Sequence, residues 1–442
     1  MKKRLTRKQK IIRRNLFLGL CAVVLIGVIS LLGLGVGKLI TLIDTNEPQN
    51  NSSVQSEPEY VEPYVVSSAT VVNTGDILIH GPVLKGAYNS DTKEYDFSAL
   101  YRYTKDYFDK ADLVIANLEV TLGGSESGSY RGYPSFNTPD SLIDDLKEAG
   151  IDMLLTSNNH CYDTGLFGIK RTARVLKEKN VDFIGTRETE DEPIYTVKDV
   201  KGIKIGMACY TYENKNEDTS RKSINGAIIN TQANNLLNSF SYNHIEDFYT
   251  EAGSVIADMK QKGAEAIVFY MHWGEEYQLT QNTWQKNIAQ KLCDLGVDII
   301  VGGHPHVIQP IEMLSSSDGL HKTICLYSMG NSVSNQRLSA LYKSCPTGHT
   351  EDGMLFYYTF DKYSDGKVML SSVDIVPAWV RKTGSSNSAQ YSLFPLENAD
   401  SYNQYSLTDK TAAGSYERTK NIVGQGLTAC QQELGCKVRF AE

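Results

Sequence analysis

"VGGHPHVIQP", residues 301–310, places two histidines, His304 and His306, around one proline directly after an apolar run. The run "VDIIVGG" (297–303) is typical of a buried strand, and a strand that only needed to turn would not require two imidazoles. Pro305 restricts the backbone and helps to aim both rings into one pocket. The stretch therefore predicts a strand whose carboxyl end carries chemistry.

The chain beyond Val65 alternates apolar runs with amphipathic ones. Buried strands are predicted at 69–75, 111–118, 151–157, 204–210, 265–272, 297–303 and 323–330. "TPDSLIDDLKEAG" predicts a helix with Thr138 as N-cap and Gly150 as its end. "TWQKNIAQKLCDLG" predicts a helix whose buried face holds Trp284, Ile288, Leu292 and Leu295. This alternation predicts an α/β domain.

Five of the predicted strands end in polar side chains capable of chemistry. These are Asp76 and His80, Asn117 and Glu119, Asn158 with Asn159 and His160, His272, and His304 with His306. Sites in open α/β sheets gather beyond the carboxyl ends of the strands. We therefore expect these side chains to converge, although they are far apart in the sequence.

The residue types at these strand ends favour a metal site. Carboxylates, amides and imidazoles form an oxygen and nitrogen ligand set that suits manganese, iron or zinc, and no cysteine cluster has the spacing of a structural zinc site. A single histidine is more often an ordinary buried or surface residue, but five of the eight histidines follow apolar strands beside carboxylates or amides. The other candidates, His244, His321 and His349, lack this setting.

The N-terminus has the pattern of a membrane anchor. Residues 1–14 are a basic head without acids, and residues 15–40 contain an uncharged run from Leu16 through Gly37. At about 1.5 Å per residue this run approaches the roughly 30 Å of a bilayer core. The basic flank predicts a cytoplasmic N-terminus and an extracellular main domain. A cleaved signal peptide is the alternative.

The net negative charge of the chain argues against nucleic acid as a partner. The chain carries 44 Lys and Arg against 52 Asp and Glu, and the eight cations of the basic head leave 36 against 52 for the rest. Bulk electrostatics therefore argue against nucleic-acid binding, and an acidic substrate would need local positive charge such as metal ions.

Six motifs in order carry a resemblance to a known family. They are "GDILIH", "ANLEVTL", "SNNHCYDTG", "HWGEEY", "GGHPHVIQ" and "YSMGNSV", and this set resembles the capsule-biosynthesis CapA family, associated with poly-γ-glutamate. "YPSFNTP" (133–139) fits as well. The family is similar in turn to the calcineurin-like metallophosphoesterases, which implies a four-layer α/β/β/α sandwich holding one or two divalent transition metals.

The resemblance implies a role for each strand-end residue. Asp76 and His306, with His80 as a further candidate, would hold one metal, and Asn159, His272 and His304 would hold the other, with Glu119 as the bridge. His160 would act as general acid or oxyanion donor, and Asp163 would hold it in position. Metal-activated water would then attack phosphorus or a carbonyl carbon. Residues expected to face the substrate are Asn117, Phe136, Asn137, Asn158, Trp273, Glu276, Tyr277 and Asn331.

Several of these assignments have plain alternatives. Trp273 could pack the core, Glu276 could be a solvated charge, and turn chemistry alone could explain Asn331. The motifs also depart from the phosphoesterase pattern. His80 stands four residues after Asp76 where Asp-x-His is usual, Glu119 replaces an aspartate, and Ser332 stands where the CapA family often has an aromatic residue.

The expected organisation is a basic head (1–14), a transmembrane signal-anchor (15–40), a flexible tether (41–66), a CapA-like domain (67–385) and a C-terminal appendage (386–442). The expected function is capsule polymer synthesis, export or attachment at the cell membrane. Expected partners are an anionic polymer such as poly-γ-glutamate and other capsule membrane proteins. The alternatives are a metal-dependent phosphoesterase with an unrelated extracellular substrate and a non-catalytic polymer-binding module.

Overall fold

The structure, a computed structural model, describes residues 61–214, 221–384, 388–397 and 410–440. The chain divides into two compact units, Met1–Glu62 and Pro63–Glu442, and the fold below is that of the second unit. The basic head, the predicted transmembrane segment and nearly all of the predicted tether lie outside the described residues. Within the described ranges, no helix has the length and apolarity needed to cross a membrane.

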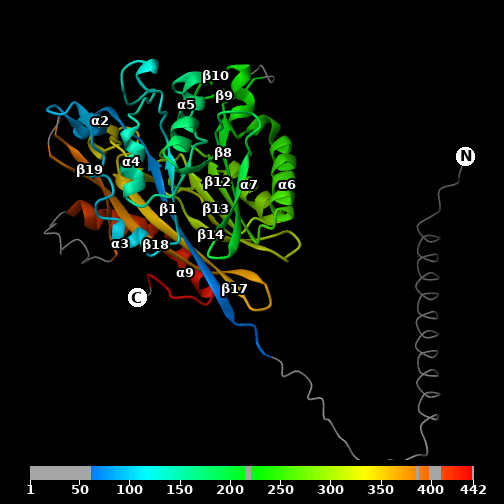
Figure 1. Ribbon diagram of the computed structural model, residues 1–442. Helices are drawn as coiled ribbons and strands as arrows, with labels where there is room; N and C mark the ends of the chain where they lie inside the picture. The colour runs from blue at the N-terminus through cyan, green and yellow to red at the C-terminus, as the bar shows by residue number, and fades with distance from the viewer. Residues whose placement is uncertain (1–60, 215–220, 385–387, 398–409, 441–442) are drawn as a thin grey trace, which may run out of the picture. The chain divides into compact units, whose positions relative to one another are not determined.

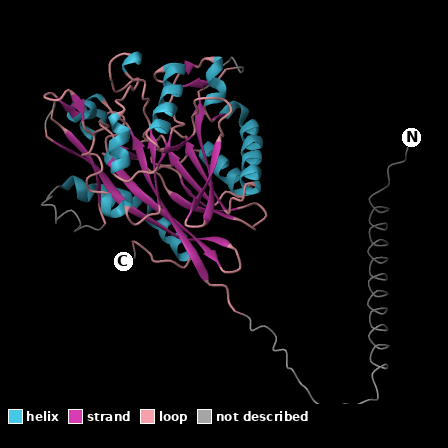
Figure 2. Cartoon of the chain, in the orientation of Figure 1, coloured by secondary structure: helices cyan, strands magenta, loops and turns pink. Residues whose placement is uncertain are grey.

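The first sheet has eight strands. In spatial order they are β19 (Gln390–Pro395), β18 (Val368–Thr383), β17 (Asp352–Tyr363), β1 (Val65–Ile77), β4 (Leu113–Leu118), β5 (Met153–Leu155) and β6 (Asp182–Ile184), with β16 (Asn331–Val333) pairing with β1. Figures 1 and 2 draw its long strands as arrows, with β1, β17 and β18 labelled in Figure 1. Strands β1, β4, β5 and β6 run parallel, and β17, β18 and β19 continue the sheet antiparallel. The parallel half has the continuous apolar runs that the sequence predicts.

The second sheet has seven strands. In spatial order they are β11 (Ser239–Ser241), β8 (Ile203–Glu213), β12 (Ala266–His272), β13 (Ile299–Gly303), β15 (Lys322–Leu326) and β14 (Ile311–Ser315), with β7 (Tyr195–Val200) pairing with β8. The first five are parallel, so their carboxyl ends lie at one edge. All seven strands predicted from apolar runs are confirmed to within a few residues.

Apolar residues of the two sheets form three main cores. One core joins the first sheet to α2 (Gly81–Ala87), α3 (Lys105–Phe108), α4 (Ser141–Glu148) and α5 (Gly165–Glu178). A second contains residues of both sheets. The third joins the second sheet to α6 (Ile245–Gln261) and α7 (Thr283–Asp294). The domain is therefore a mixed α/β structure in which both sheets contribute to one shared core.

Two helix details differ from the prediction. Helix α4 begins at Ser141 after Asp140 rather than at a Thr138 cap, and the buried Oγ1 of Thr138 has no hydrogen-bond partner among the described residues. Helix α7 is capped by a reciprocal pair of bonds between Asn282 and Gln285. Trp284 is 42% exposed and packs on Tyr242 instead of joining the buried face.

The predicted C-terminal appendage is wrong for the described residues. Strand β19 pairs with β18 inside the first sheet, and helix α9 (Lys410–Glu433) places Val423, Leu427 and Cys430 in the core shared by both sheets. Gly426 does not interrupt this helix. A Cβ at Gly426 would lie 2.0 Å from the carbonyl oxygen of Ile311, so the glycine is what lets α9 approach the edge strand β14.

Candidate metal centre

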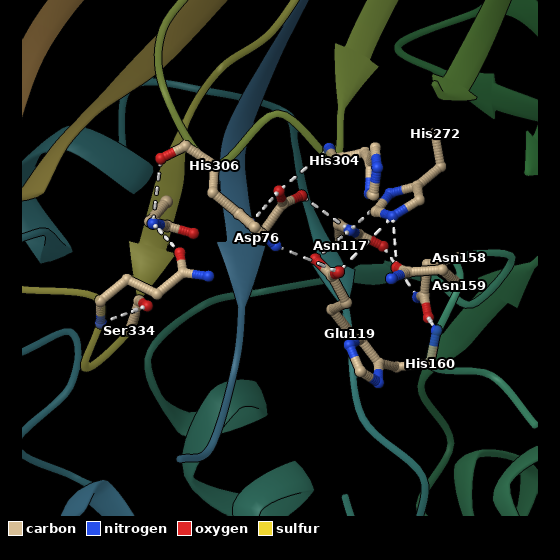
Figure 3. A network of polar contacts seen from close by, with 12 residues as sticks. Asp76, Asn117, Glu119, Asn158, Asn159, His160, His272, His304, His306 and Ser334 are labelled. Atoms are coloured by element: carbon tan, nitrogen blue, oxygen red, sulfur yellow. Dashed lines mark hydrogen bonds and ion pairs between the residues drawn. The ribbon is translucent and has the colours of Figure 1, made fainter. Parts of the chain in front are cut away.

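The ends of β1, β4, β12 and β13 converge as the sequence predicts. Strand pairing sets Asp76 opposite Asn117 and His272 opposite Gly303, and the loop after β5 adds Asn158, Asn159 and His160. Figure 3 shows these side chains pointing toward one another from separate strands. Asp76, Glu119, His272, His304 and His306 are all buried.

Two groups of possible ligands overlap at one residue. Glu119, His272 and His304 form one group, and Asp76, Glu119 and His306 form the other. In each group the ligand atoms lie within 4.8 Å of one another. Glu119 is thus shared between the groups, which is the position expected of a bridging carboxylate.

The "GGHPH" stretch is shaped by close contacts and by unusual backbone angles. A Cβ at Gly302 would lie 1.9 Å from the carbonyl oxygen of Tyr327, and one at Gly303 would lie 2.8 Å from Asp76 Oδ1. His304 and His306 adopt positive φ angles of 94° and 55°. Such angles are uncommon for residues other than glycine and persist where the surroundings impose them. Gly302 lets the strand approach the backbone of Tyr327, Gly303 lets the strand end approach Asp76, and the turn directs both imidazoles inward.

Three buried atoms support the fit to metal. Within the described residues, Glu119 Oε1, His304 Nδ1 and His306 Nδ1 have no hydrogen-bond partner. Buried polar atoms are almost always paired because leaving them unpaired is costly. Carboxylate oxygens and imidazole nitrogens are also the donors that manganese, iron and zinc accept. These residues could therefore hold a metal ion.

The charged residues of the two ligand groups shift one another's pKa values. Burial acts to raise the pKa of Asp76, but the contact with His306 and the charge of His272 outweigh it and hold that pKa below its ordinary value. Burial acts to lower the pKa of His306, but Glu119 and Asp76 raise it to about 9. For His304, burial and the neighbouring histidines together hold the pKa well below its ordinary value.

Three asparagines organise the site. Asn159 Oδ1 lies 2.8 Å from His272 Nε2, and its role as a ligand stays a prediction. Asn117 donates from Nδ2 to Asp76 Oδ1 at 2.7 Å. Asn158 donates to Asn117 Oδ1 and to the carbonyl of Leu118, and its Oδ1 accepts the N–H of His160. Asn117 therefore holds Asp76 in place, and Asn158 holds Asn117 and the backbone of His160.

His160 and Asp163 form a pair beside the ligand groups. His160 Nδ1 lies 2.7 Å from Asp163 Oδ2, and the same oxygen accepts the backbone N–H of Phe136. The ring of Phe136 meets His160 edge-on, with centroids 4.7 Å apart. Asp163 thus contacts Nδ1 of His160, and Phe136 packs on the ring.

Three more residues predicted to face the substrate belong to the framework. Trp273 is completely buried in the core with α6 and α7 and donates Nε1–H to the carbonyl of Tyr327. Asn137 donates to the carbonyls of Gly124, Gly128 and Ser129. Asn331 donates to the carbonyls of His306 and Thr350 and to Gln336. The Trp273 indole and the Nδ2 groups of both asparagines are therefore held by internal contacts, whereas Oδ1 of Asn137 and of Asn331 has no hydrogen-bond partner among the described residues.

The remaining candidates lie around the ligand groups. His80 falls outside both groups, and its Nδ1 accepts the backbone N–H of Asn335. Burial lowers the pKa of His80 to about 4, so the ring is neutral. Tyr277 is half-buried, with its ring 6.4 Å from that of His306, and Glu276 is exposed. Ser332 is buried and bonded to Thr74 and Tyr101.

Sequence reasoning missed two residues near the site. Tyr212 lies at the end of β8, and its ring packs on His304 at 4.8 Å. The predicted strand ends at Tyr210, two residues before Tyr212, and a tyrosine gives no metal signal. Asn225 lies within 3.5 Å of His160 Nδ1. The Asn-Gly dipeptide at 225–226 is a strong hairpin signal from which this turn could have been predicted.

The fold is an α/β domain, and two overlapping groups of buried possible metal ligands lie at its strand ends. These two features define a protein with a candidate metal centre. Residues 70–336 match the family described as "Bacterial capsule synthesis protein PGA_cap". This match covers more than half of the chain, and the chain belongs to that family. The resemblance to CapA drawn from the motifs is confirmed.

Two relatives carry related names. The chain is 29% identical over 271 residues to the capsule biosynthesis protein CapA of Bacillus anthracis, and it spans 60% of that protein's length. It is 26% identical over 311 residues to the PGA biosynthesis protein CapA of Bacillus subtilis (strain 168), covering 68% of this chain and 73% of that one. Among solved structures, TT1561 of Thermus thermophilus matches 65% of this chain and 93% of its own at 8% identity, with a TM-score of 0.32.

Proposed function

We propose that this chain acts in the synthesis, export or attachment of a capsule polymer of the poly-γ-glutamate type, through a metal-dependent hydrolase-like site. The observation that carries the proposal is the sharing of Glu119 between two buried ligand groups, with the His160–Asp163 pair beside them. Membership of the capsule synthesis family and the names of its relatives support the polymer.

The proposed architecture is the four-layer α/β/β/α sandwich of the metallophosphoesterases. Its support lies in the three cores, in which the two sheets share a middle core and each packs helices in a second one. In this architecture the strand ends of both sheets open toward the same site. That placement suits an extended polymer whose backbone must reach buried ligands.

Different residues of the site would bind the metals and transfer the proton. Divalent metals held there would stabilise negative charge on the attacking and leaving oxygens and supply a nucleophilic water near neutral pH. Asp76, Glu119, His272, His304, His306 and Asn159 would hold them. His160 donates its Nδ1 proton to Asp163, which leaves Nε2 to give a proton to the leaving group or to take one.

The proposed setting is the outer face of the cell membrane. The basic head and uncharged run support a single-pass anchor with a cytoplasmic N-terminus. Other capsule synthesis and export membrane proteins are proposed as partners, and nucleic acid is not, because the chain carries net negative charge.

Two alternatives share the same site. In the first, the chain hydrolyses a phosphoester of an unrelated extracellular substrate, which the resemblance to metallophosphoesterases favours. In the second, the site binds the polymer without cleaving it. The departures at His80 and Glu119 favour this second alternative, because either change could weaken one metal position.

One experiment separates these functions. The full chain, purified in detergent, is loaded with Mn²⁺ and incubated with poly-γ-glutamate of defined length and, separately, with bis(p-nitrophenyl) phosphate. Shortening of the polymer that is lost in His160→Ala supports the proposed hydrolase. Turnover of the phosphodiester alone favours the phosphoesterase, and binding of the polymer without cleavage favours the binding module. A chain that holds no metal would contradict the proposal.

A further inference from the structure

A two-stranded hairpin overhangs His160. Strands β9 (Ser223–Ile224) and β10 (Ala227–Ile228) pair antiparallel around Asn225 and Gly226. These two residues have φ angles of 49° and 77°, as a type I′ turn requires. Asn-Gly is a dipeptide that this turn favours, so the turn accounts for the residue type, and the question that remains is what the side-chain amide of Asn225 contacts.

The hairpin is fixed to the segment that carries His160. Ile224 and Ile229 pack in one apolar cluster with Cys161, and the backbone N–H of Asn230 donates to the hydroxyl of Tyr162 at 3.0 Å. At the tip, the N–H of Gly226 donates to Asn214 Oδ1 at 2.6 Å, just beyond the end of β8. The tip residue Asn225 is thus held at a set position over the ring.

The amide of Asn225 is not consumed by His160. Its Nδ2 lies 3.5 Å from His160 Nδ1, but that nitrogen lies 2.7 Å from Asp163 Oδ2. Asp163 Oδ2 also accepts the N–H of Phe136, so the carboxylate is the acceptor and His160 Nδ1 carries the proton. A protonated Nδ1 has no lone pair with which to accept from Asn225. Among the described residues, the amide of Asn225 makes no other hydrogen bond, and the residue is exposed.

We propose that the Asn225 amide binds a carboxylate oxygen of the polymer unit on the leaving-group side of the scissile bond. This inference rests on the proposed function, in which the reacting group lies on the ligand groups and His160 serves the leaving group. A chain leaving past the Nδ1 edge of His160 reaches Asn225 next. Asn225 is then a specificity-determining residue for an acidic polymer.

The test compares three variants of the full chain in detergent with saturating Mn²⁺. Asn225→Gly keeps the turn and removes the amide. Asn225→Asp keeps the turn and replaces two donors with a negative charge. Asn180→Gly is the matched control, because Asn180 is also an exposed asparagine with positive φ, of 53°, but follows the far end of α5. Binding of fluorescent poly-γ-glutamate and of its fully amidated form is measured by anisotropy, together with metal content.

We expect Asn225→Gly to bind the acidic polymer about tenfold more weakly than the parent, with unchanged metal content, and Asn180→Gly to match the parent. Asn225→Asp should bind the acidic polymer more weakly still, yet bind the amidated polymer at least as well as Asn225→Gly does, since a carboxamide can donate to Asp. Asn225→Asp is thus expected to rank below Asn225→Gly on the acidic polymer but not on the amidated one. A purely structural role for Asn225 would give the same ranking on both polymers.

Two outcomes would overturn the inference and are distinct. If the parent binds the acidic polymer and Asn225→Gly binds it within about twofold of the parent, Asn225 makes no such contact, and the proposed function stands. If the parent holds metal but binds neither polymer, the inference fails together with the polymer assignment.

Discussion

The imidazole rings of His304 and His306 lie 6.0 Å apart across one proline, yet each belongs to a different ligand group. His304 joins Glu119 and His272, whereas His306 joins Glu119 and Asp76. The turn, with its two positive φ angles, therefore places His304 in one ligand group and His306 in the other. Glu119 is the one residue that the two groups share. This division makes the roles of individual residues separable by experiment.

Glu119 should control the second metal. Glu119→Gln keeps the shape of the side chain but removes the charge that offsets repulsion between two cations, so the second ion should bind far more weakly. Glu119→Asp shortens the side chain but keeps the charge, and it should retain more metal than Glu119→Gln. Metal content at fixed free Mn²⁺ measures this. If Glu119→Gln and the parent hold equal amounts of metal, Glu119 is not a bridge. The site would then be a one-metal site or a site that only binds the polymer.

The two histidines of the motif should each control one position. His304→Ala and His306→Ala each remove a ligand from a different group, so each should lower the content by about one ion per chain if two ions bind. His160→Ala serves as the control, because it should keep its metal and lose any hydrolysis. Metal analysis of the three variants in parallel checks this, and equal loss in all three would show that the division of roles is wrong.

Metal affinity should rise with pH. The negative charges of Glu119 and Asp76 overcome burial and raise the pKa of His306 to about 9, so this ring is protonated at pH 7 without metal. A metal must displace that proton, and affinity should therefore increase up to about tenfold per pH unit from about pH 6 until it levels near pH 9. Titration in weak buffer should record about one proton released near pH 7. If His306→Gln releases as many protons on metal binding as the parent does, the released proton does not come from His306.

Removing Arg418 should destabilise the docked C-terminal helix. Arg418 binds Asp352 through two bonds of 2.7 and 2.6 Å, and the Asp352 side chain is 1% exposed. Arg418→Ala leaves this carboxylate buried without its partner, which typically costs about 3–5 kcal/mol. Glu417→Ala, an exposed neighbour on α9, should change the unfolding midpoint little. An equal midpoint for the two variants would contradict the role of this ion pair.

The Arg418→Ala defect should also depend on pH. Burial outweighs Arg418 and raises the pKa of Asp352 to about 6. A carboxyl whose folded pKa is raised contributes stability below its unfolded pKa, and that contribution is lost as the pH rises through the folded value. Without Arg418 the folded pKa should rise further, so the difference in midpoint from the parent should shrink from about pH 7 to about pH 5. Asp352→Asn added to Arg418→Ala should abolish this dependence.

The orientation of the N-terminal segment remains a prediction. The basic head should stay in the cytoplasm and the domain should face outward. External protease on intact cells should therefore cut within the predicted tether and release the domain. Protection of the domain until the membrane is broken would contradict this orientation, and release of the domain without protease would indicate the cleaved signal peptide.

Much of the fold could be predicted because apolar runs have a local physical cause. A strand buried on both faces needs a continuous apolar run, and each of the seven runs became a strand. The C-terminal region could not be predicted in this way. Its helix contains Gly426, which local propensity disfavours, and only the closeness of Ile311 explains why a glycine is required there.

The sequence by itself determined which side chains meet, because parallel strands bring their carboxyl ends to one edge and polar residues follow those strands. It did not determine what each side chain does there. Asn117 and Asn158 hold other residues, Trp273 packs the core, and Asn225 reaches His160 from a hairpin outside the main sheets. Those roles depend on neighbours that are distant in the chain, and the period of a strand or helix carries no information about them. The family resemblance implied that His304 and His306 serve different metals, and the tertiary packing places them in two different ligand groups.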